Sequence, residues 1–420
     1  MVSVGKQMSD LLALLSLIWT VIFIGIALIK LLDAKFNALY ATMLGMGGFS
    51  LIDISKYYYV DYARVGWVGD DVFQSVTLLI WLSCSLIIFT YFIFKRYYIQ
   101  RVKISYYIKS RGIFIYFIKI ALVPISLLFI AINDGSGYMG ILGGFIKGFI
   151  VALIIYGLME KDRIAIIVGV ISLFCGVDDS SRRAYIAIFF PIIIMLVYSY
   201  KEKIGQVTIR VKILLVILLF LVFVFLNALR SEHNFGEGFD PDNRVNNTMH
   251  YITTLGSIDT FHNTAFIYER FPSPWDYYYG ETYLSVFVAL IPRFIWPDKP
   301  VSLGAQLGLM KRFGYRGFDQ SLWEEAFMFS LSPSFVGEAY ANFGFIGVIF
   351  LSLLLGIIAA YLDKKIYNVI KITTIPWIIF LSSFILFHRG DFYVSVNYQI
   401  FMFFAATIFY KFSYKKVLKG

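Results

Sequence analysis

Charged residues are scarce in this chain. Only 15% of its 420 residues are charged, against about a quarter in a typical soluble domain, while 59% are hydrophobic and the mean hydropathy is +0.74. This composition excludes an ordinary soluble domain and indicates a polytopic membrane protein. The net charge of +10 lies mostly in loops beside hydrophobic runs, where it sets membrane orientation, so we expect no nucleic-acid partner.

Cysteine and histidine are also rare, with two and four residues respectively. Cys84 and Cys175 fall in apolar segments, which excludes a disulfide framework and a cysteine-based metal site. His233, His250 and His262 lack the spacing of metal ligands, so we expect no metal. The chain contains neither a Walker loop nor a dinucleotide fingerprint, which argues against nucleotide-driven work, and we expect no cofactor.

Long hydrophobic runs predict the fold. A bilayer requires roughly 17–25 mostly apolar residues per helix. The runs predict an all-α polytopic integral membrane protein of about 11 (10–12) transmembrane helices, with one large extracytoplasmic segment that contains short amphipathic helices. The predicted spans are 10–30, 37–54, 72–94, 113–132, 141–159, 164–178, 184–199, 211–229, 337–361, 374–388 and 394–411.

Clusters of basic residues predict the orientation of the spans. Six Lys and Arg residues lie between positions 95 and 111 without one acid, so this loop is expected in the cytoplasm. Counting spans from it places the basic clusters at 201–212, 364–371 and 411–419 on the same side. The N-terminus is then outside, or inside if the second span does not cross. The chain divides into an N-terminal bundle (1–229), an extracytoplasmic (periplasmic) segment (230–336) and C-terminal helices (337–420).

Two short helices are expected within the extracytoplasmic segment. Residues 250–271 show apolar side chains at three- and four-residue spacing, which predicts an amphipathic helix on the membrane surface or against the bundle. Residues 282–295 predict a second helix too short to span. Trp296 follows it and is expected at the level of the lipid headgroups.

Arginines at the predicted outer surface contradict the usual preference of basic residues for the cytoplasmic side. A guanidinium is planar, permanently charged and binds phosphate oxygens bidentately, so these residues predict a diphosphate site. The alternative is that each only anchors a helix end or pairs with a nearby Asp. The candidate diphosphate-binding residues are Arg182, Arg183, Arg230, Arg293, Lys299 and Arg389.

Glu338 is the first candidate for a general base. It follows Gly337 at the start of the ninth predicted span, where an ionisable group is costly unless it faces a cavity. The alternative is a carboxylate that is merely favoured by the dipole of its own helix. His388, at the outer end of the tenth span, is the second candidate, and a simple interfacial histidine is its alternative.

Two runs resemble a known family. Ile291–Pro300 and Pro333–Gly344, supported by Ser181–Arg183 and His388–Phe392, are similar to the O-antigen polymerase, or oligosaccharide repeat-unit polymerase, family of bacterial surface-polysaccharide assembly (Wzy type). The resemblance implies a metal-independent membrane glycosyltransferase. It would transfer a growing glycan from one undecaprenyl diphosphate carrier onto another lipid-linked repeat unit, on the outer face of the bacterial cytoplasmic (inner) membrane. It also implies roles for Arg182 or Arg183, Arg293 and Arg389.

The residues agree with this chemistry. The arginines would stabilise the departing diphosphate, and Glu338 or His388 would accept the proton of the acceptor hydroxyl. The expected partners are undecaprenyl-diphosphate-linked oligosaccharides, membrane lipid and a regulator of chain length. Two alternatives stay open: an O-antigen ligase that uses a lipid A core acceptor, and a lipid-linked oligosaccharide flippase or transporter. The candidate glycan-binding residues are Trp296, Tyr340 and Asn342.

Overall fold

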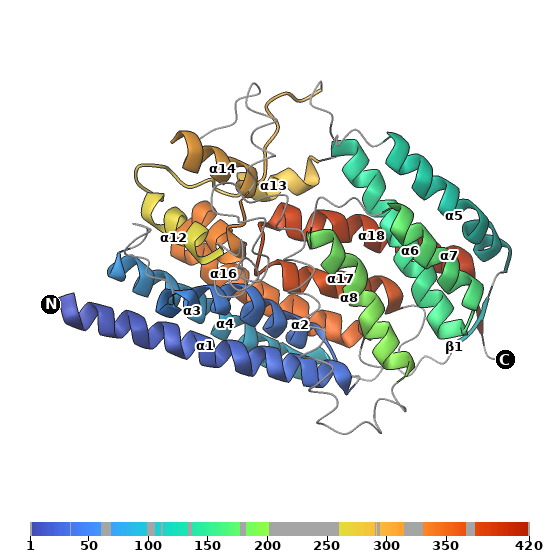
Figure 1. Ribbon diagram of the computed structural model, residues 1–420, viewed down its shortest axis with the longest axis horizontal. Helices are drawn as coiled ribbons and strands as arrows, with labels where there is room; N and C mark the ends of the chain where they lie inside the picture. Colours follow the sequence, from blue (N-terminus) through green and yellow to red (C-terminus); the bar gives the residue numbers. More distant parts are fainter. Residues whose placement is uncertain are drawn as a thin grey trace, which may run out of the picture.

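The computed structural model describes most of the chain, and nearly all of the described part is helical. The described residues are 2–33, 35–59, 69–98, 106–110, 112–132, 137–176, 182–200, 260–289, 291, 295–314, 331–366 and 374–418. Figure 1 shows the helices gathered into one bundle, with the shorter helices α12, α13 and α14 along one edge. A helical architecture is therefore confirmed for the described residues.

The N-terminal half consists mainly of long apolar helices. The second predicted span is built from three consecutive pieces, α2 (Ala38–Gly45), the π-helix η1 (Met46–Leu51) and α3 (Ile52–Tyr59). The other helices are α1 (Val2–Leu32), α4 (Asp70–Tyr98), α5 (Gly112–Ile132), α6 (Gly137–Glu160), α7 (Arg163–Gly176) and α8 (Arg182–Ser199).

The C-terminal half combines short and long helices. The short helices are α12 (Thr260–Arg270), α13 (Glu281–Phe287) and α14 (Leu303–Phe313). The longer ones are α16 (Ser334–Ile366), α17 (Ile375–Leu386) and α18 (Phe392–Ser413). Helices thus lie on ten of the eleven predicted spans. The remaining predicted span, 211–229, lies outside the described residues.

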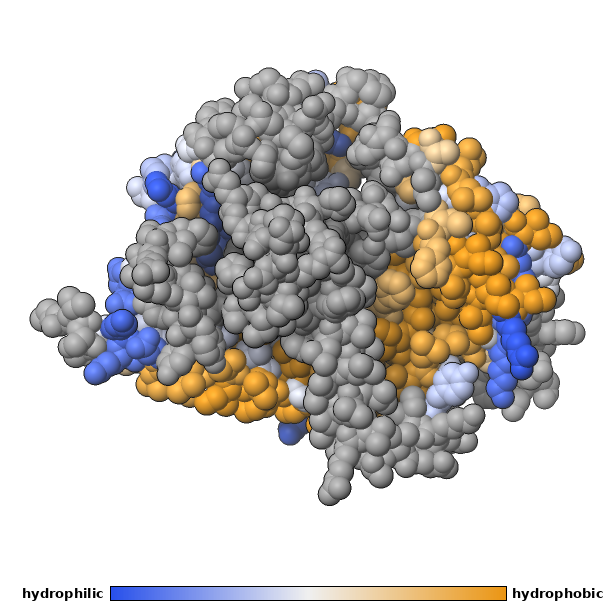
Figure 2. All heavy atoms as spheres, viewed as in Figure 1, coloured by the Kyte–Doolittle hydropathy of each residue, from blue (hydrophilic) through white to orange (hydrophobic). Residues whose placement is uncertain are grey.

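Six of the described helical segments are long and apolar enough to cross a membrane. They are Gly5–Leu32, Ala38–Ser55, Asp70–Arg96, Gly112–Phe129, Leu142–Glu160 and Ser334–Ile366. Arg163–Cys175, Ile186–Ser199 and Ile375–Leu386 are apolar but shorter. Large apolar side chains are exposed along these helices, including Ile113 at 89% and Phe174 at 83%, and Figure 2 shows this hydrophobic surface around α5 to α7. The architecture is that expected of a multi-pass membrane protein.

Small residues allow the long helices to approach closely. A Cβ atom added at Gly356 of α16 would lie 2.6 Å from the carbonyl oxygen of Ile87 in α4. Near this point, the hydroxyls of Ser83 and Ser352 are 2.6 Å apart. Small residues and interhelical hydroxyl contacts are common where membrane helices pack, because packing rather than water exclusion drives their association. The same device joins α6 to α18, where Gly148 faces Met402.

Buried carboxylates tie the starts of helices to distant parts of the chain. Asp363 in α16 accepts hydrogen bonds from the backbone N–H of Ala38, 2.7 Å away at the start of α2, and from the Tyr91 hydroxyl. Asp53 in α3 accepts from the N–H of Phe261 in the first turn of α12. The first N–H groups of a helix lack partners within the helix, and its dipole favours an anion there, so these contacts satisfy groups that would otherwise be buried unpaired.

Replacing Asp363 by Ala is expected to lower the free energy of unfolding by at least about 2 kcal/mol. The change leaves the Ala38 N–H and the Tyr91 O–H buried without their acceptor, and each such loss costs about 1–3 kcal/mol. Thermal unfolding of the purified protein in detergent measures the effect. An unfolding temperature equal to that of the wild type would show that the Asp363 contacts contribute nothing.

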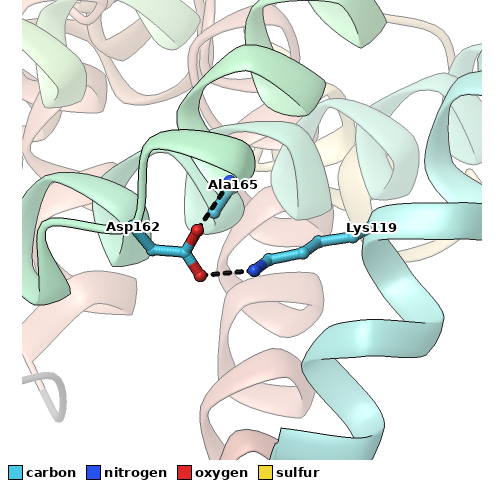
Figure 3. A network of polar contacts seen from close by, with 3 residues as sticks. All are labelled: Lys119, Asp162 and Ala165. Atoms are coloured by element: carbon cyan, nitrogen blue, oxygen red, sulfur yellow. Dashed lines mark hydrogen bonds and ion pairs between the residues drawn. The ribbon is translucent and has the colours of Figure 1, made fainter.

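Asp162 provides the control for this experiment. It accepts hydrogen bonds from Lys119 in α5 and from the N–H of Ala165 near the start of α7 (Figure 3). Both side chains of the ion pair are partly exposed. Asn remains a good cap for α7, so Asp162→Asn removes only the ion pair and should cost less than about 1 kcal/mol.

A small antiparallel sheet joins two segments that the sequence does not predict to pair. Strand β1 (Tyr106–Ser110) follows α4, and strand β2 (Tyr414–Leu418) ends the described chain. The register pairs Tyr106 with Leu418 and Ser110 with Tyr414. The sheet places residues 106–110, from the predicted basic loop, beside residues 414–418, from the predicted basic tail (Figure 1). The cytoplasmic placement of the two basic clusters stays a prediction.

Candidate functional site

The run Pro333–Gly344 lies at the centre of the candidate site. It forms the first part of α16, and the helix kinks at Gly344, whose φ of 62° and ψ of −149° are outside the helical range. A Cβ atom at Gly344 would lie 2.6 Å from the Tyr277 hydroxyl oxygen. This backbone conformation and this close approach both require glycine. The kink therefore separates a short helical piece, which carries Glu338 and Asn342, from the long apolar part of α16 that follows.

Three other parts of the chain hold this short helical piece. The Thr264 hydroxyl of α12 donates to the carbonyl of Pro333 (2.8 Å). The N–H groups of Tyr278 and Tyr279 donate to the carbonyls of Ala341 (3.0 Å) and Asn342 (3.1 Å). On the remaining side, the Phe335 N–H donates to the Phe387 carbonyl at 2.9 Å, which brings in the loop that carries His388 and Arg389. Of the runs that the sequence singles out, Pro333–Gly344 and His388–Phe392 are thus brought together.

Glu338 connects three helices. Its side chain is 0% exposed, and it accepts hydrogen bonds from the Thr282 hydroxyl in α13 (2.7 Å) and from the backbone N–H of Phe392, the first residue of α18. The carboxylate therefore sits at the start of α18, where the helix dipole favours it. The sequence predicts, as the non-catalytic alternative, that Glu338 stabilises its own helix. In the structure the helix start that it contacts belongs to another helix.

Asp391 and Tyr283 lie close to Glu338. Asp391 is buried and accepts a hydrogen bond from the Gly304 N–H in the first turn of α14 at 2.7 Å. Burial and then the negative charges of Glu338 and Asp391 raise the pKa of Tyr283 well above its usual range. The ring of Tyr283 is partly exposed, but its hydroxyl oxygen is buried and, among the described residues, has no hydrogen-bond partner. Two carboxylates and a phenol therefore share one buried region.

Asn342 is fully buried and uses its amide within the protein. Its Nδ2 donates to the Thr282 hydroxyl oxygen and to the Glu338 carbonyl, both at 2.8 Å, and its Oδ1 accepts from the Gly280 N–H at 2.9 Å. Thr282 thus receives one hydrogen bond from Asn342 and donates one to Glu338. Asn342 therefore orders the site through these hydrogen bonds, and its predicted contact with glycan stays a prediction.

Aromatic rings surround the network. Tyr340 packs against Tyr268 and Tyr277, with ring centroids 5.1 and 6.3 Å apart, and Tyr283 stacks on Phe343 at 6.4 Å. Trp296 is 37% exposed and lies beyond the end of α13. Of the three residues predicted to bind glycan, Tyr340 and Trp296 therefore offer partly exposed rings, whereas Asn342 is buried.

His388 and Arg389 lie in the turn between α17 and α18. The His388 imidazole is buried, lies edge-on to Phe335 at 5.1 Å, and packs against Gly45, where a Cβ atom would be 2.8 Å from its Cδ2. Its Nδ1 has no hydrogen-bond partner among the described residues. The guanidinium carbon of Arg389 lies 5.7 Å from the centroid of the Phe49 ring. Of the two, Arg389 is the partly exposed residue.

The family comparison covers most of these elements. A family model described as a domain of unknown function, DUF8712, matches residues 81–419. The chain belongs to the DUF8712 family. Searches of curated proteins and of solved structures found no match. The part that matches DUF8712 includes Glu338, Asn342 and the turn with His388 and Arg389, whereas α1, α2, η1 and α3 precede it.

The cationic candidates of this DUF8712 protein are only partly described. Arg182 and Arg183 form the start of α8, and the structure describes their backbone only; Arg230 and Arg293 lie outside the described residues. The Lys299 ammonium donates to the carbonyls of Val288 (3.5 Å), Ala289 (3.2 Å) and Ile291 (2.7 Å). Its predicted contact with diphosphate stays a prediction.

Lys299 also explains why the expected helix over 282–295 is too long. The observed helix α13 ends at Phe287, and the next carbonyls turn toward the Lys299 ammonium. A lysine that binds carbonyls beyond a helix end stabilises the end of that helix. The predicted helix over 250–271 is described only as α12, Thr260–Arg270. It packs against α4 and α16, that is, against the bundle.

Sequence reasoning overlooked several residues of the site. Asp391 lies within the run His388–Phe392 but is not singled out, and Tyr283 and Thr282 carry no motif. Thr282 is 56 residues from Glu338 in the chain, so spacing gives no sign of their contact. Among the described residues, no group of three or more His, Cys, Asp or Glu is placed to hold a metal ion.

Proposed function

We propose that this DUF8712 protein polymerises undecaprenyl-diphosphate-linked oligosaccharide repeat units by glycosyl transfer on the outer face of the cytoplasmic membrane. The observation that carries the proposal is the meeting of Pro333–Gly344, the segment that contains α13 and the turn His388–Phe392 around one buried carboxylate, Glu338. Two of these runs and the adjoining Ile291–Pro300 carry the resemblance to repeat-unit polymerases. The reaction also requires an ordered acidic and aromatic site, here in contact with the turn that carries Arg389.

The proposed reaction transfers a glycan between two lipid carriers. The bond between the anomeric carbon and the diphosphate oxygen breaks, a hydroxyl of the acceptor unit forms the new glycosidic bond, and the diphosphate leaves on its lipid. Arg389, with Arg182 or Arg183, Arg230 and Arg293, binds that diphosphate as its negative charge develops. The energy is already stored in the sugar–diphosphate bond, so no nucleotide is required.

Glu338 is our first choice of general base, ahead of His388. In the structure its Oε1 already accepts the hydrogen bond of a neutral hydroxyl, that of Thr282. We propose that the acceptor hydroxyl replaces the Thr282 hydroxyl at Oε1 and transfers its proton there as the glycosidic bond forms. Asn342 and the Phe392 N–H hold the remaining contacts of the network during this exchange.

The proposal requires the site on the outer side and the basic clusters on the cytoplasmic side. In a chain without Cys84 and Cys175, we expect Asp276→Cys to react with a membrane-impermeant thiol reagent in intact spheroplasts. Lys411→Cys should react only after the membrane is permeabilised. Both wild-type side chains are exposed, so both positions are accessible to the reagent from their own side. Labelling of both cysteines in intact spheroplasts would contradict the orientation.

The lipid-linked glycans of a deletion strain test the proposed function. Loss of a polymerase should leave only single repeat units attached to the lipid A core, without chains of two or more units. Loss of an O-antigen ligase should instead leave full-length polymer on the carrier lipid. The second pattern would contradict the proposed polymerisation and support the ligase.

One observation favours a second candidate, a lipid-linked oligosaccharide flippase or transporter. Such proteins use interrupted helices near their substrates. Here α16 is broken at Gly344, and the second predicted span contains the π-helix η1. Loss of a flippase would leave lipid-linked repeat units on the cytoplasmic side. Under the proposed polymerase function, units in the deletion strain are fully accessible from outside, so oxidation of their sugars by external periodate in spheroplasts distinguishes the two.

A further inference from the structure

We propose that Phe49 of the π-helix η1 is a positioning residue for Arg389, so that the second predicted span completes the diphosphate site. This inference rests on the proposed function, because it assigns Arg389 to a lipid diphosphate. The resemblance, the outer arginines and the DUF8712 match do not include Phe49, which precedes residue 81. The assignment comes from what lies beneath the turn that carries His388 and Arg389.

Three residues of one short segment contact this turn. Phe49 lies under Arg389, with 5.7 Å between the guanidinium carbon and the ring centroid. The hydroxyl of the next residue, Ser50, donates to the His388 carbonyl at 3.3 Å. At Gly45 a Cβ atom would lie 2.8 Å from both the His388 ring and the Ile385 carbonyl oxygen, so only glycine allows the turn to come this close.

The π-helix explains how these three residues reach the same side. In an α-helix residues four apart share a face, but a residue five positions away is turned aside by about 140°. A π-helix closes its hydrogen bonds over five residues, which brings Ser50 back toward the face of Gly45 while Phe49 stays on it. Helical insertions of this kind are frequent at functional sites.

The opposite side of η1 is held just as closely. A Cβ atom at Gly47 would lie 2.8 Å from Cγ1 of Ile24 and 3.2 Å from the carbonyl oxygen of Thr20, both in α1. The π-helix is therefore packed between α1 and the turn from Ile385 to Arg389. A segment held on both sides supplies a rigid support for the Phe49 ring.

An aromatic ring under a guanidinium fixes its plane as well as its position. Bidentate binding of a diphosphate requires that plane to be oriented, and a long side chain without such support must first lose rotamer freedom. The ring face also attracts the positive charge, most strongly where water is excluded. Phe49 acts on the diphosphate through Arg389 and does not touch it.

Binding of a short isoprenoid diphosphate tests the inference. We expect purified wild-type protein in detergent to bind geranylgeranyl diphosphate more tightly than geranylgeraniol, and Arg389→Ala to abolish this preference. Phe49→Leu should weaken diphosphate binding roughly fivefold or more, the range expected for a lost cation–π contact, and Phe49→Tyr should retain it. Phe145→Leu is the control, since Phe145 is also partly buried and packs on another ring, that of Phe401.

A second variant separates positioning from folding. Phe49→Met keeps a long apolar side chain without the ring and should weaken binding like Phe49→Leu. Neither change should weaken it further when added to Arg389→Ala. Wild-type-like binding by a folded Phe49→Met protein would overturn the inference. So would a Phe49 substitution that weakens diphosphate binding equally in the wild type and in Arg389→Ala. If the wild type binds the diphosphate and the alcohol equally well, the proposed diphosphate site itself is wrong. This result is distinct from one in which the wild type prefers the diphosphate but the Phe49 substitutions have no effect.

Discussion

Arg389→Ala is expected to abolish polymer formation while the amount of protein in the membrane stays the same. Its guanidinium is partly exposed and lies over the Phe49 ring, whereas the printed hydrogen bonds of the Glu338 carboxylate come from Thr282 and Phe392 and do not involve it. Loss of a preorganised group that stabilises developing charge typically costs at least about a hundredfold in rate. Glycan analysis and an immunoblot of the same membranes measure the two quantities.

The conservative variant separates geometry from charge. Arg389→Lys retains the positive charge but cannot bind two phosphate oxygens in parallel or lie flat on the Phe49 ring, so it should restore little activity. Arg270→Ala is the control, because Arg270 is an exposed arginine over the Phe266 and Trp275 rings that is not part of the predicted site. Full activity of Arg389→Lys would reduce Arg389 to a simple charge anchor.

Glu338→Gln is expected to leave binding of lipid-linked repeat units intact and to slow polymerisation at least about a hundredfold. Glutamine has nearly the same volume, and its oxygen can still accept from the Phe392 N–H while the Thr282 hydroxyl turns to accept from its amide. The fold should therefore survive. What disappears is the proton acceptor, which contributes roughly 10²–10⁴-fold in rate, or about 3–5 kcal/mol of barrier.

Thr282→Val is the matched comparison. It removes only the hydroxyl that donates to Oε1 and keeps the carboxylate, so it should slow the reaction far less than Glu338→Gln. If Glu338 serves only the start of α18, its charge contributes about 0.3–1 kcal/mol to stability, and Glu338→Gln should turn over almost normally. That result would remove Glu338 from the catalytic step and leave His388 to be tested in the same assay.

Hydrophobic runs predicted where helices lie because each span must be apolar over its whole length. Their ends and interruptions were harder to predict. The kink at Gly344 arises from a close approach to Tyr277, and the end of α13 depends on Lys299, which lies 11 residues beyond Val288. Neither contact leaves a periodic pattern in the sequence.

The composition of the site was predictable only in part. Glu338 stands out because an acid near a membrane span is costly, and His388–Phe392 stands out by its polarity. The hydrogen bonds that organise the site join distant residues, such as Thr282 and Asn342, which are 60 residues apart. Elsewhere in the fold, Ala38 and Asp363 are joined although they are 325 residues apart. Tyr283 and Phe49 are two aromatic residues among 79, counted as 30 Tyr, 42 Phe and 7 Trp, so their type alone marks no function.

Reconstitution tests the proposed polymerase function most directly. Purified wild-type protein, placed in lipid vesicles with undecaprenyl-diphosphate-linked repeat units as the sole substrate, should produce a ladder of longer lipid-linked glycans. One free lipid diphosphate should be released for each new glycosidic bond, without added nucleotide. Folded protein that leaves every unit single, or that moves units across the bilayer without joining them, would contradict the account.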